Sequence, residues 1–226
     1  MTTQQTLPGN VLQAAPGLSG FDTDTVLTST TAQQFANEGY VFCARYLSLG
    51  NTQAEGDLSY SEAADILAAG LCLTAVQHVM AEGWHPNAAL GVQFGQNAAS
   101  NAASVGLPQG MNIWCDLEGI AEGVPATSVI DYCQAWYNAV NAAGYVPGLY
   151  VGANAILNGE QLYEDLSFAH YWKSLSSVPM VAVRGYQLIQ GHTTTVNGVG
   201  IDTDTTQTDN LGGNVLWLAP PATTNA

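Results

Sequence analysis

Short apolar segments alternate with longer segments of mixed character along most of the chain. The apolar segments are 18–22, 40–47, 71–79, 111–119, 145–152, 170–175, 181–190 and 196–202. Most of them are continuously apolar, which is typical of parallel strands covered on both faces. Helical signals fill the gaps between the first six, at 29–37, 59–69, 87–105, 127–143 and 153–166. This alternation predicts an α/β fold with a parallel sheet.

Eight strands in a chain of 226 residues predict a single (β/α)8 TIM-like barrel. The last strands follow one another too closely for full helices, so we expect reduced helices in the last third. Residues 1–16 are polar and interrupted by proline and glycine, and we expect a flexible N-terminal arm there. The barrel is predicted over 17–218. Residues 219–226 open with two prolines after Ala219 and are expected to form a disordered tail.

Basic residues are scarce in this chain. Three Lys and Arg residues against eighteen Asp and Glu residues give a formal net charge of −15. Because phosphate contacts need Lys and Arg, the composition argues against nucleic acid and against an anionic membrane surface as partners. No apolar run approaches the roughly 18 residues of a membrane span. We therefore expect no membrane insertion, and the first ten residues lack the features of a secretory signal.

The four cysteines show no Cys-x-x-Cys spacing, which argues against zinc and thioredoxin-type sites. Free buried thiols are favoured over disulfides because a buried cysteine behaves as a small apolar residue. The residues concerned are Cys43, Cys72, Cys115 and Cys133.

Acidic residues gather at the ends of three predicted strands. Asp22 and Asp24 end the first strand, Asp116 and Glu118 end the fourth, and Asp202 and Asp204 end the eighth. Side chains two apart on a strand point the same way, and the carboxyl ends of barrel strands are where active sites form. Two close carboxylates resist simultaneous ionisation, which leaves a proton donor beside a charged group. The sequence therefore predicts an acidic active site at the barrel mouth.

Aromatic residues are expected near the same rim, where flat rings offer stacking surfaces for sugars. They are Tyr46, Trp84, Trp114, Tyr150, Trp172 and Tyr186.

Several short motifs occur in the order seen in a known group of enzymes. They are Gly20-Phe-Asp22, Asp116-Leu-Glu118, Gly148-Leu-Tyr150, Trp172, Tyr186-Gln187 and Gly200-Ile-Asp202-Thr-Asp204. Together they resemble the lysozymes of glycoside hydrolase family 25. The chain is still more similar to the glycoside-hydrolase-like barrels of domain-of-unknown-function family 1906, where a segment like Arg45-Tyr46-Leu47 also occurs. The resemblance covers roughly residues 17–218.

The lysozyme resemblance implies hydrolysis of the β-1,4 bond after N-acetylmuramic acid in peptidoglycan, without a cofactor. It implies that Glu118 is the general acid and that Asp116 is the second catalytic carboxylate, either as nucleophile or by steering the substrate's acetamido group. Asp22 and Asp202 would hold the acid and the sugar, and Tyr150 would support an oxocarbenium-like transition state. The further substrate-binding residues by position are Tyr46, Trp172, Tyr186, Gln187 and Asp204. Asp204 departs from the lysozyme pattern, which usually has Asn there.

Two other functions stay open. One is a non-catalytic barrel that binds carbohydrate or peptidoglycan. The other is a metal-dependent hydrolase, although no His-x-His or His-x-x-Glu-His pattern supports it. Its candidate ligands would be His78, Asp22, Asp116, Glu118 and Asp202. Arg45 is interpreted as a structural base beneath the acidic rim that offsets repulsion between carboxylates.

The net charge bears on delivery to the substrate. Peptidoglycan carries carboxylates, so a protein at −15 is repelled at long range except where salt screens the charges. We therefore expect either a delivery partner, such as a phage particle or a secretion apparatus, or a neutral glycan as substrate. With no secretory signal recognised in the sequence, the resemblance predicts action at the cell wall by a non-classical, phage or secretion-system route.

Overall fold

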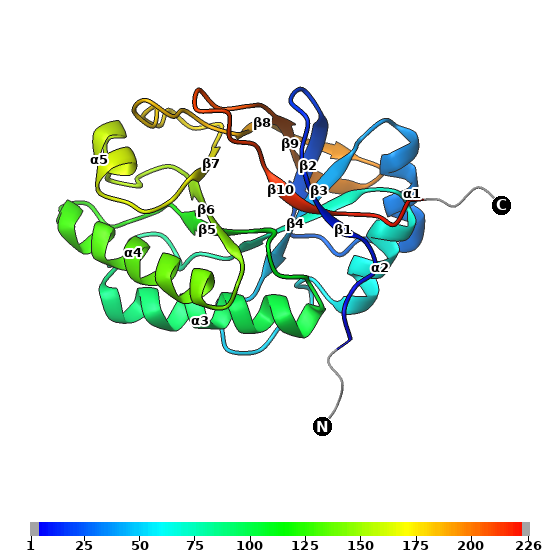
Figure 1. Ribbon diagram of the computed structural model, residues 1–226, viewed down its shortest axis with the longest axis horizontal. Coiled ribbons are helices and arrows are strands. Elements are labelled where there is room, and N and C mark those ends of the chain that lie inside the picture. Colours follow the sequence, from blue (N-terminus) through cyan, green and yellow to red (C-terminus); the bar gives the residue numbers. More distant parts are fainter. Residues whose placement is uncertain (1–4, 223–226) are drawn as a thin grey trace.

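A computed structural model describes residues 5–222, and its centre is a closed barrel of eight strands with helices between them (Figure 1). The barrel strands are β2 (Ser19–Thr23), β3 (Phe42–Leu47), β4 (Cys72–Gln77), β5 (Asn112–Leu117), β6 (Val146–Val151), β7 (His170–Lys173), β8 (Leu188–Val196) and β9 (Val199–Thr206). The helices are α1 (Ser29–Asn37), α2 (Tyr60–Ala68), α3 (Ala88–Val105), α4 (Ala126–Ala142) and α5 (Gly159–Glu164). Two outer strands, β1 (Asn10–Gln13) and β10 (Leu216–Ala219), complete the sheet. The predicted TIM-like barrel with reduced helices in the last third is confirmed.

Neighbouring strands of the barrel are parallel except at β9. β4 and β5 are parallel, as are all neighbours from β2 through β8. β9 runs antiparallel to both β8 and β2, with Asp202 paired to Asp22. The expectation of a fully parallel barrel was therefore wrong for the last strand. Its physical reason is length: only a tight turn separates β8 from β9, which permits a hairpin but not a crossover.

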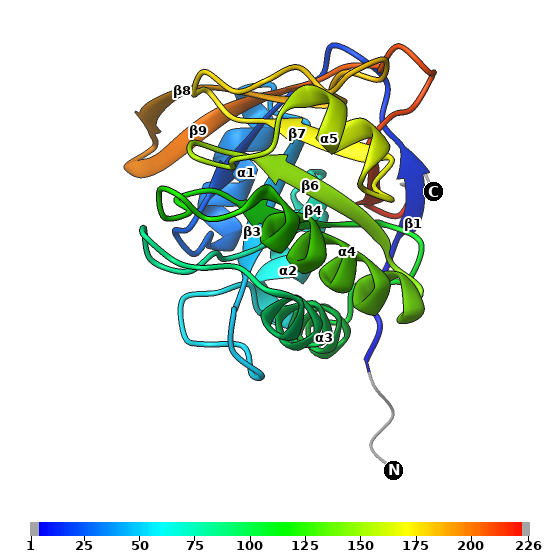
Figure 2. The same cartoon turned by 90° about the vertical axis from the view of Figure 1, so that its left-hand side faces the viewer.

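The helices cover the outside of the barrel, with α3 and α4 side by side below β5 and β6 (Figure 2). The two helices approach closely because Gly91 and Gly95 lack side chains. A Cβ at Gly91 would lie 2.2 Å from the carbonyl oxygen of Tyr132, and one at Gly95 would lie 2.7 Å from that of Trp136. The many small residues of α3 thus serve its packing.

Two predicted elements in the last third were wrong in extent. The helix expected over 153–166 is only α5, because Asn158 caps it and Ile156 has a φ of 69° that no helix accommodates. The strand expected over 181–190 begins only at Leu188. Residues 181–187 form turns in which Val183 has a φ of 60°.

Apolar side chains form two layers, one inside the barrel and one between the barrel and its helices. The inner layer is aromatic: Trp114 and Trp172 meet edge to face with 5.8 Å between ring centroids, and Phe42 contacts Trp217 of β10. Gly20 and Gly148 provide the room, since Cβ atoms there would collide with Phe42 and Trp114. The floor of the barrel is therefore solid, and open space remains only above it.

β1 and β10 form an antiparallel pair that covers the amino-terminal end of the barrel. β10 contacts β4 through Leu218 and Leu73, and the Leu216 N–H donates to Asn112 Oδ1. The expectation of a flexible arm over 1–16 is therefore wrong where β1 forms. The expected disordered tail began at Ala219, but this residue is the last one of β10. Residues 1–4 and 223–226 lie outside the described part.

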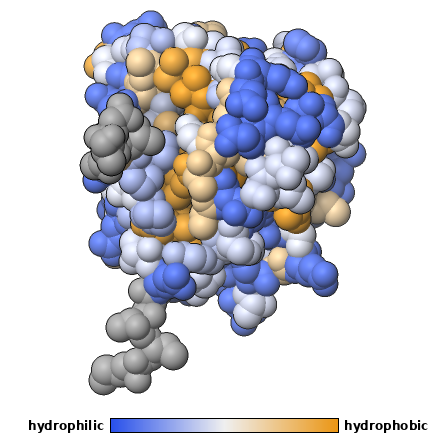
Figure 3. All heavy atoms as spheres, turned by 90° about the vertical axis from the view of Figure 1, so that its right-hand side faces the viewer, coloured by the Kyte–Doolittle hydropathy of each residue, from blue (hydrophilic) through white to orange (hydrophobic). Residues whose placement is uncertain are grey.

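On the face seen in Figure 3, a narrow apolar band runs between hydrophilic areas.

The four cysteines are buried free thiols, as predicted. Arg45 is also buried, but on the outer side of β3, where Nε lies 2.6 Å from Glu62 Oε1 of α2. Its guanidinium also donates to the carbonyl oxygens of Thr23 and Gly56. The interpretation of Arg45 as a counter-charge for the rim acids was therefore wrong, because strand alternation turns it away from the barrel interior. No helix within residues 5–222 has the length and apolarity to cross a membrane.

Candidate active site

The carboxyl end of β5 presents two acids to the barrel mouth. Asp116 points inward from β5, and Glu118 follows just after the strand. The chain then turns at Gly119, whose φ is 64°, and the Trp84 indole N–H fixes the turn by donating to the Glu118 carbonyl oxygen at 2.8 Å. Gly152 leaves room for the Glu118 side chain, since a Cβ there would lie 2.4 Å from Oε2.

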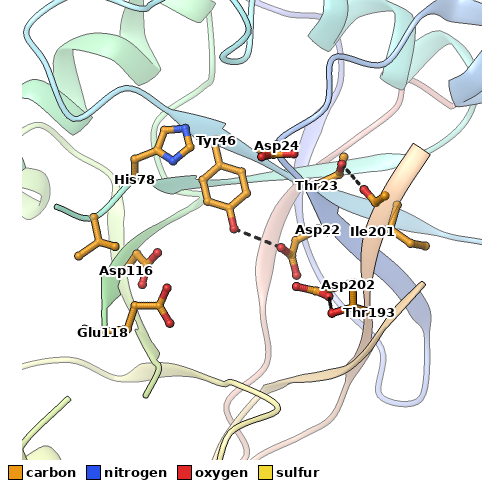
Figure 4. A pocket seen from close by; sticks show the side chains of 12 residues that line it. Asp22, Thr23, Asp24, Tyr46, His78, Asp116, Glu118, Thr193, Ile201 and Asp202 are labelled. Atoms are coloured by element: carbon orange, nitrogen blue, oxygen red, sulfur yellow. Dashed lines mark hydrogen bonds between the residues drawn. The ribbon is translucent and has the colours of Figure 1, made fainter. Parts of the chain in front are cut away.

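Two further acids face this pair from the opposite wall. Asp22 on β2 and Asp202 on β9 are paired neighbours, and Gln190 of β8 links them. Gln190 Nε2 donates to Asp22 Oδ2 at 2.9 Å and to Asp202 Oδ2 at 3.3 Å. Tyr46 Oη donates to Asp22 Oδ1 at 3.2 Å, and Thr193 donates to Asp202. Figure 4 shows Asp116 and Glu118 facing Asp22 and Asp202 across open space.

The space between the two walls is a pocket of about 440 Å³. The four acids, Tyr46 and His78 are among its lining residues. A smaller cavity of about 100 Å³ is lined by three of these acids, Asp116, Glu118 and Asp202, and in addition by Tyr150, Trp172 and Gln190. The pocket therefore has an acidic wall on each side and aromatic rings in its depth.

Burial shifts the proton affinities of the β5 pair. It is the main cause that raises the pKa of Glu118, and the charge of Asp202 adds to it. Burial also raises the pKa of Asp116 well above the usual range, followed by the charges of Glu118 and Asp22. Asp116 Oδ1 is buried without a hydrogen-bond partner in the described structure. Both carboxyl groups are thus suited to hold a proton above the usual pH range of a carboxyl.

Asp22 has a pKa near neutrality. Burial raises it to about 6, against the lowering effect of the Gln190 hydrogen bond, while the charge of Asp202 raises it further. Gln190 is itself held by Tyr150, whose hydroxyl donates to Gln190 Oε1 at 2.9 Å. The orientation of Asp22 is therefore fixed by a network that reaches from β2 to β6.

The structure brings together most of the residues that the sequence singled out. Asp22, Asp116, Glu118 and Asp202 share one pocket with Tyr46, and Tyr150 and Trp172 lie deeper in it. Asp204 lies inside the barrel and outside the set that lines the pocket, because β9 runs antiparallel and carries it downward.

Tyr186 and Gln187, which the resemblance suggested as substrate-binding residues, do not line the pocket. Both are buried in the turns before β8, where the Tyr186 hydroxyl donates to the Pro179 carbonyl oxygen. The Gln187 side chain donates to Ala169 O and Asp209. They brace the loop that leads into β8.

Sequence reasoning missed Gln190 and Thr193 as site residues. Gln190 follows Leu188 by two positions on β8, and both face the barrel interior. Its signal was therefore present in the strand period, because Gln190 lies at the carboxyl end of the strand predicted over 181–190. His78 lines the pocket and stacks on Tyr46, and its Nε2 lies 2.8 Å from Asp57 Oδ1.

The candidate metal ligands line the same pocket but are not arranged as a metal site. Among the described residues, no group of three or more His, Cys, Asp or Glu side chains has a geometry that could hold a metal ion.

Comparison with known proteins relates the chain to glycoside hydrolase-like barrels. A family model described as Rv2525c-like, glycoside hydrolase-like domain matches residues 33–208. The crystal structure of the Tat-secreted protein Rv2525c of Mycobacterium tuberculosis, in complex with L-tartrate, superposes with a TM-score of 0.65 and 18% identity. That match covers 85% of this chain and 96% of the other.

Two endolysins share the fold as well. The catalytic domain of endolysin ply40 from bacteriophage P40 of Listeria monocytogenes has a TM-score of 0.59 and 15% identity, covering 86% of this chain and 95% of that domain. The CTP1L endolysin has a TM-score of 0.59 and 16% identity, covering 84% of this chain and 66% of its own. Among curated proteins, none matches the chain in sequence.

Proposed function

Because this chain belongs to the Rv2525c-like family of glycoside hydrolase-like domains, we propose that it is a glycoside hydrolase of bacterial cell-wall peptidoglycan. The proposed reaction is that of a muramidase, the cleavage of β-1,4 bonds after N-acetylmuramic acid. The two endolysins that share the fold favour a glycan of the cell wall as substrate.

One observation carries the proposal: five acidic residues on or just after three strands line a single pocket, and the pKa of Glu118 among them is raised. Glycoside hydrolysis needs one carboxyl that holds a proton at working pH and a second group that stabilises the positive charge of the transition state. Glu118 on one wall and the Asp22–Asp202 pair on the other meet this need.

Glu118 acts as general acid in this proposal. It donates its proton to the glycosidic oxygen as the bond to the anomeric carbon breaks, and it later takes a proton from the attacking water. Gly152 and the Trp84 hydrogen bond keep the residue at the pocket wall. Burial and the Asp202 charge favour the protonated form that the first step requires.

Asp116 completes the pair as the residue that orients the substrate's own acetamido group. Its unpartnered, buried Oδ1 can accept the amide N–H and so direct the acetamido oxygen toward the anomeric carbon. The charges of Asp22 and Asp202 face the developing oxocarbenium ion, and Tyr46, Tyr150 and Trp172 form the walls that hold the sugar ring.

The place of action follows from the same proposal. Peptidoglycan lies outside the cytoplasm, so the protein would act there, carried by a partner such as a phage particle or secretion apparatus. The export of Rv2525c by the Tat route is in line with an extracytoplasmic role for this fold.

The test is digestion of purified peptidoglycan with wild type and Glu118→Gln, with released fragments identified by mass spectrometry. We expect muropeptides with a new reducing end at N-acetylmuramic acid, and a loss of at least about a hundredfold in rate for the variant. The matched control is Glu122→Gln, which makes the same change at an exposed residue four positions after Glu118, and it should digest peptidoglycan normally.

The same experiment decides between an enzyme and a binding barrel. If wild type sediments with peptidoglycan but releases no fragments, the hydrolase proposal is wrong and the non-catalytic alternative is supported. If Glu118→Gln keeps full activity, the assignment of the general acid is wrong.

A further inference from the structure

Asp204 lies one step deeper in the barrel than the acids of the pocket. On β9 it pairs with Gly20, whereas Asp202 pairs with Asp22. Only 2% of Asp204 is exposed, and its side chain points into the barrel interior beside Trp172 and Asp22. An acid at this depth has no contact with bulk water, so its protonation state depends on its immediate partners.

The two oxygens of Asp204 have unequal surroundings. Oδ1 accepts from the Trp172 indole N–H at 2.9 Å, whereas Oδ2 has no donor among the described residues. Arg45, a buried base on β3, is committed to Glu62 on the outer side of the barrel. An ionised Asp204 would therefore be a buried anion with one hydrogen bond, next to a second carboxylate, which is a costly arrangement.

We propose that Asp204 carries a proton in the folded protein and donates it in a hydrogen bond to the Asp22 carboxylate. A protonated carboxyl has one O–H donor, so the oxygen that lacks a donor becomes one itself. Burial, followed by the charge of Asp22 and the hydrogen bond between the two side chains, raises the pKa of Asp204. The same hydrogen bond lowers the pKa of Asp22.

Asp204 is thus a positioning residue for Asp22. Asp22 receives three donors, from Tyr46, Gln190 and Asp204, which keep it ionised and fix its orientation toward the pocket. If the proposed hydrolase function is right, on which this step rests, Asp22 is the fixed negative charge opposite Glu118. The other titratable groups that surround the pair are Tyr46 on β3, Asp116 and Glu118 at β5, Tyr150 on β6 and Asp202 on β9.

The protonation state can be measured without any activity. In protein labelled with ¹³C at the Asp carboxyl carbon, we expect one resonance at the protonated position at about pH 7 that disappears in Asp204→Asn. Asp116→Asn should leave that resonance in place and remove another one. The control Asp131→Asn, at an exposed residue of α4, should leave both resonances in place. If Asp204→Asn removes only a resonance at the ionised position, the proposal is overturned.

The role toward Asp22 is tested by the pH profile of kcat/KM. Asp204→Asn keeps a neutral donor of the same shape, so the acidic limb should stay in place. Asp204→Leu removes the donor and should move that limb upward by about one pH unit, and the Asp22 carboxyl resonance should follow the same shift. Two results would exclude the positioning role. One is an Asp22 carboxyl that titrates at the same pH in folded Asp204→Leu as in wild type. The other is an Asp22 titration that shifts by the same amount in Asp204→Asn as in Asp204→Leu.

The two proposals fail separately. If no variant hydrolyses peptidoglycan, the carboxyl resonances still report the proton on Asp204. If Asp204→Leu does not fold, the comparison of wild type with Asp204→Asn alone decides whether the proton is present.

Discussion

The ring of Tyr46 stacks on the imidazole of His78, with 4.5 Å between the ring centroids. His78 is in turn held by Asp57 through its Nε2 atom. The stack fixes the plane of the phenol, so the hydroxyl is kept at 3.2 Å from Asp22 Oδ1. One wall of the pocket is therefore built from three strands whose side chains restrain one another.

Removing the Tyr46 hydroxyl should make Asp22 harder to ionise. Tyr46→Phe keeps the stacked ring but deletes a donor that lowers the pKa of Asp22. If ionised Asp22 is needed, the acidic limb of the kcat/KM profile should move upward by up to about one unit. Tyr137→Phe, on α4 and outside the pocket, is the control. An unchanged profile for Tyr46→Phe would show that the hydroxyl does not tune Asp22.

Filling the space beside Glu118 should impair catalysis. In Gly152→Ala the new Cβ would lie 2.4 Å from Glu118 Oε2 and 2.5 Å from its Cβ, so Glu118 must shift from its present position. A displacement of about 1 Å can cost roughly a hundredfold in rate, and we expect a loss of that order in peptidoglycan digestion. Gly50→Ala, where a Cβ meets nothing within 4 Å, should remain active. Full activity of Gly152→Ala would contradict the placement of Glu118.

The buried acids should make the protein less stable as pH rises. Burial raises the pKa values of Asp116 and Asp204 in the folded state, whereas the unfolded chain loses these protons near pH 4. The folded state then binds more protons than the unfolded state. The free energy of unfolding therefore falls with rising pH, by up to about 1.4 kcal/mol per unit for each group until its folded pKa is reached.

His170 opposes this trend at lower pH. Burial lowers its pKa to about 4, so it adds stability as pH rises toward its ordinary value of 6.5. The decline should therefore be clearest above that value, as a falling urea midpoint in equilibrium unfolding. Asp204→Asn should show a shallower decline, and a midpoint that rises with pH in the wild type would refute the assignment.

The Arg45–Glu62 pair should matter for stability and not for the pocket. Arg45→Met leaves Glu62 as a buried charge whose remaining donor is the Leu27 N–H, and we expect a loss of about 3–5 kcal/mol in the free energy of unfolding. The double variant Arg45→Met/Glu62→Leu removes both charges and should lose less. Denaturant titration of the two variants tests this, and equal losses would mean that packing, not charge pairing, is the contribution of Arg45.

The strand period predicted the pairing of acids but not their depth. Asp116 and Glu118 share the pocket because alternate residues face one side, and Asp22 meets Asp202 because the barrel closes. The direction of β9 decides the rest. In an antiparallel strand, Asp204 runs down into the core instead of out to the rim. The short spacing between the last two predicted strands was the signal for that direction, because a parallel connection needs a longer crossover.

Residues near β8 were the hardest to place. Tyr186 and Gln187 belong to a loop held by Asp209, which lies more than 20 residues further along the chain and binds Gln187 and Arg184. Such a contact has no local signature. Gln190 could have been found, because it shares the inward face with Leu188 and ends the strand that was predicted over 181–190.

The pairing of Asn10 with Ala219 brings the two ends of the described fold side by side, at the opposite end of the barrel from Asp116 and Glu118. A short linker could join these positions, and new termini could then be opened in a surface loop such as that around Gly50. A circularly permuted barrel of this kind, or one tethered to a bead through either end, would still present its cleft to an insoluble polymer.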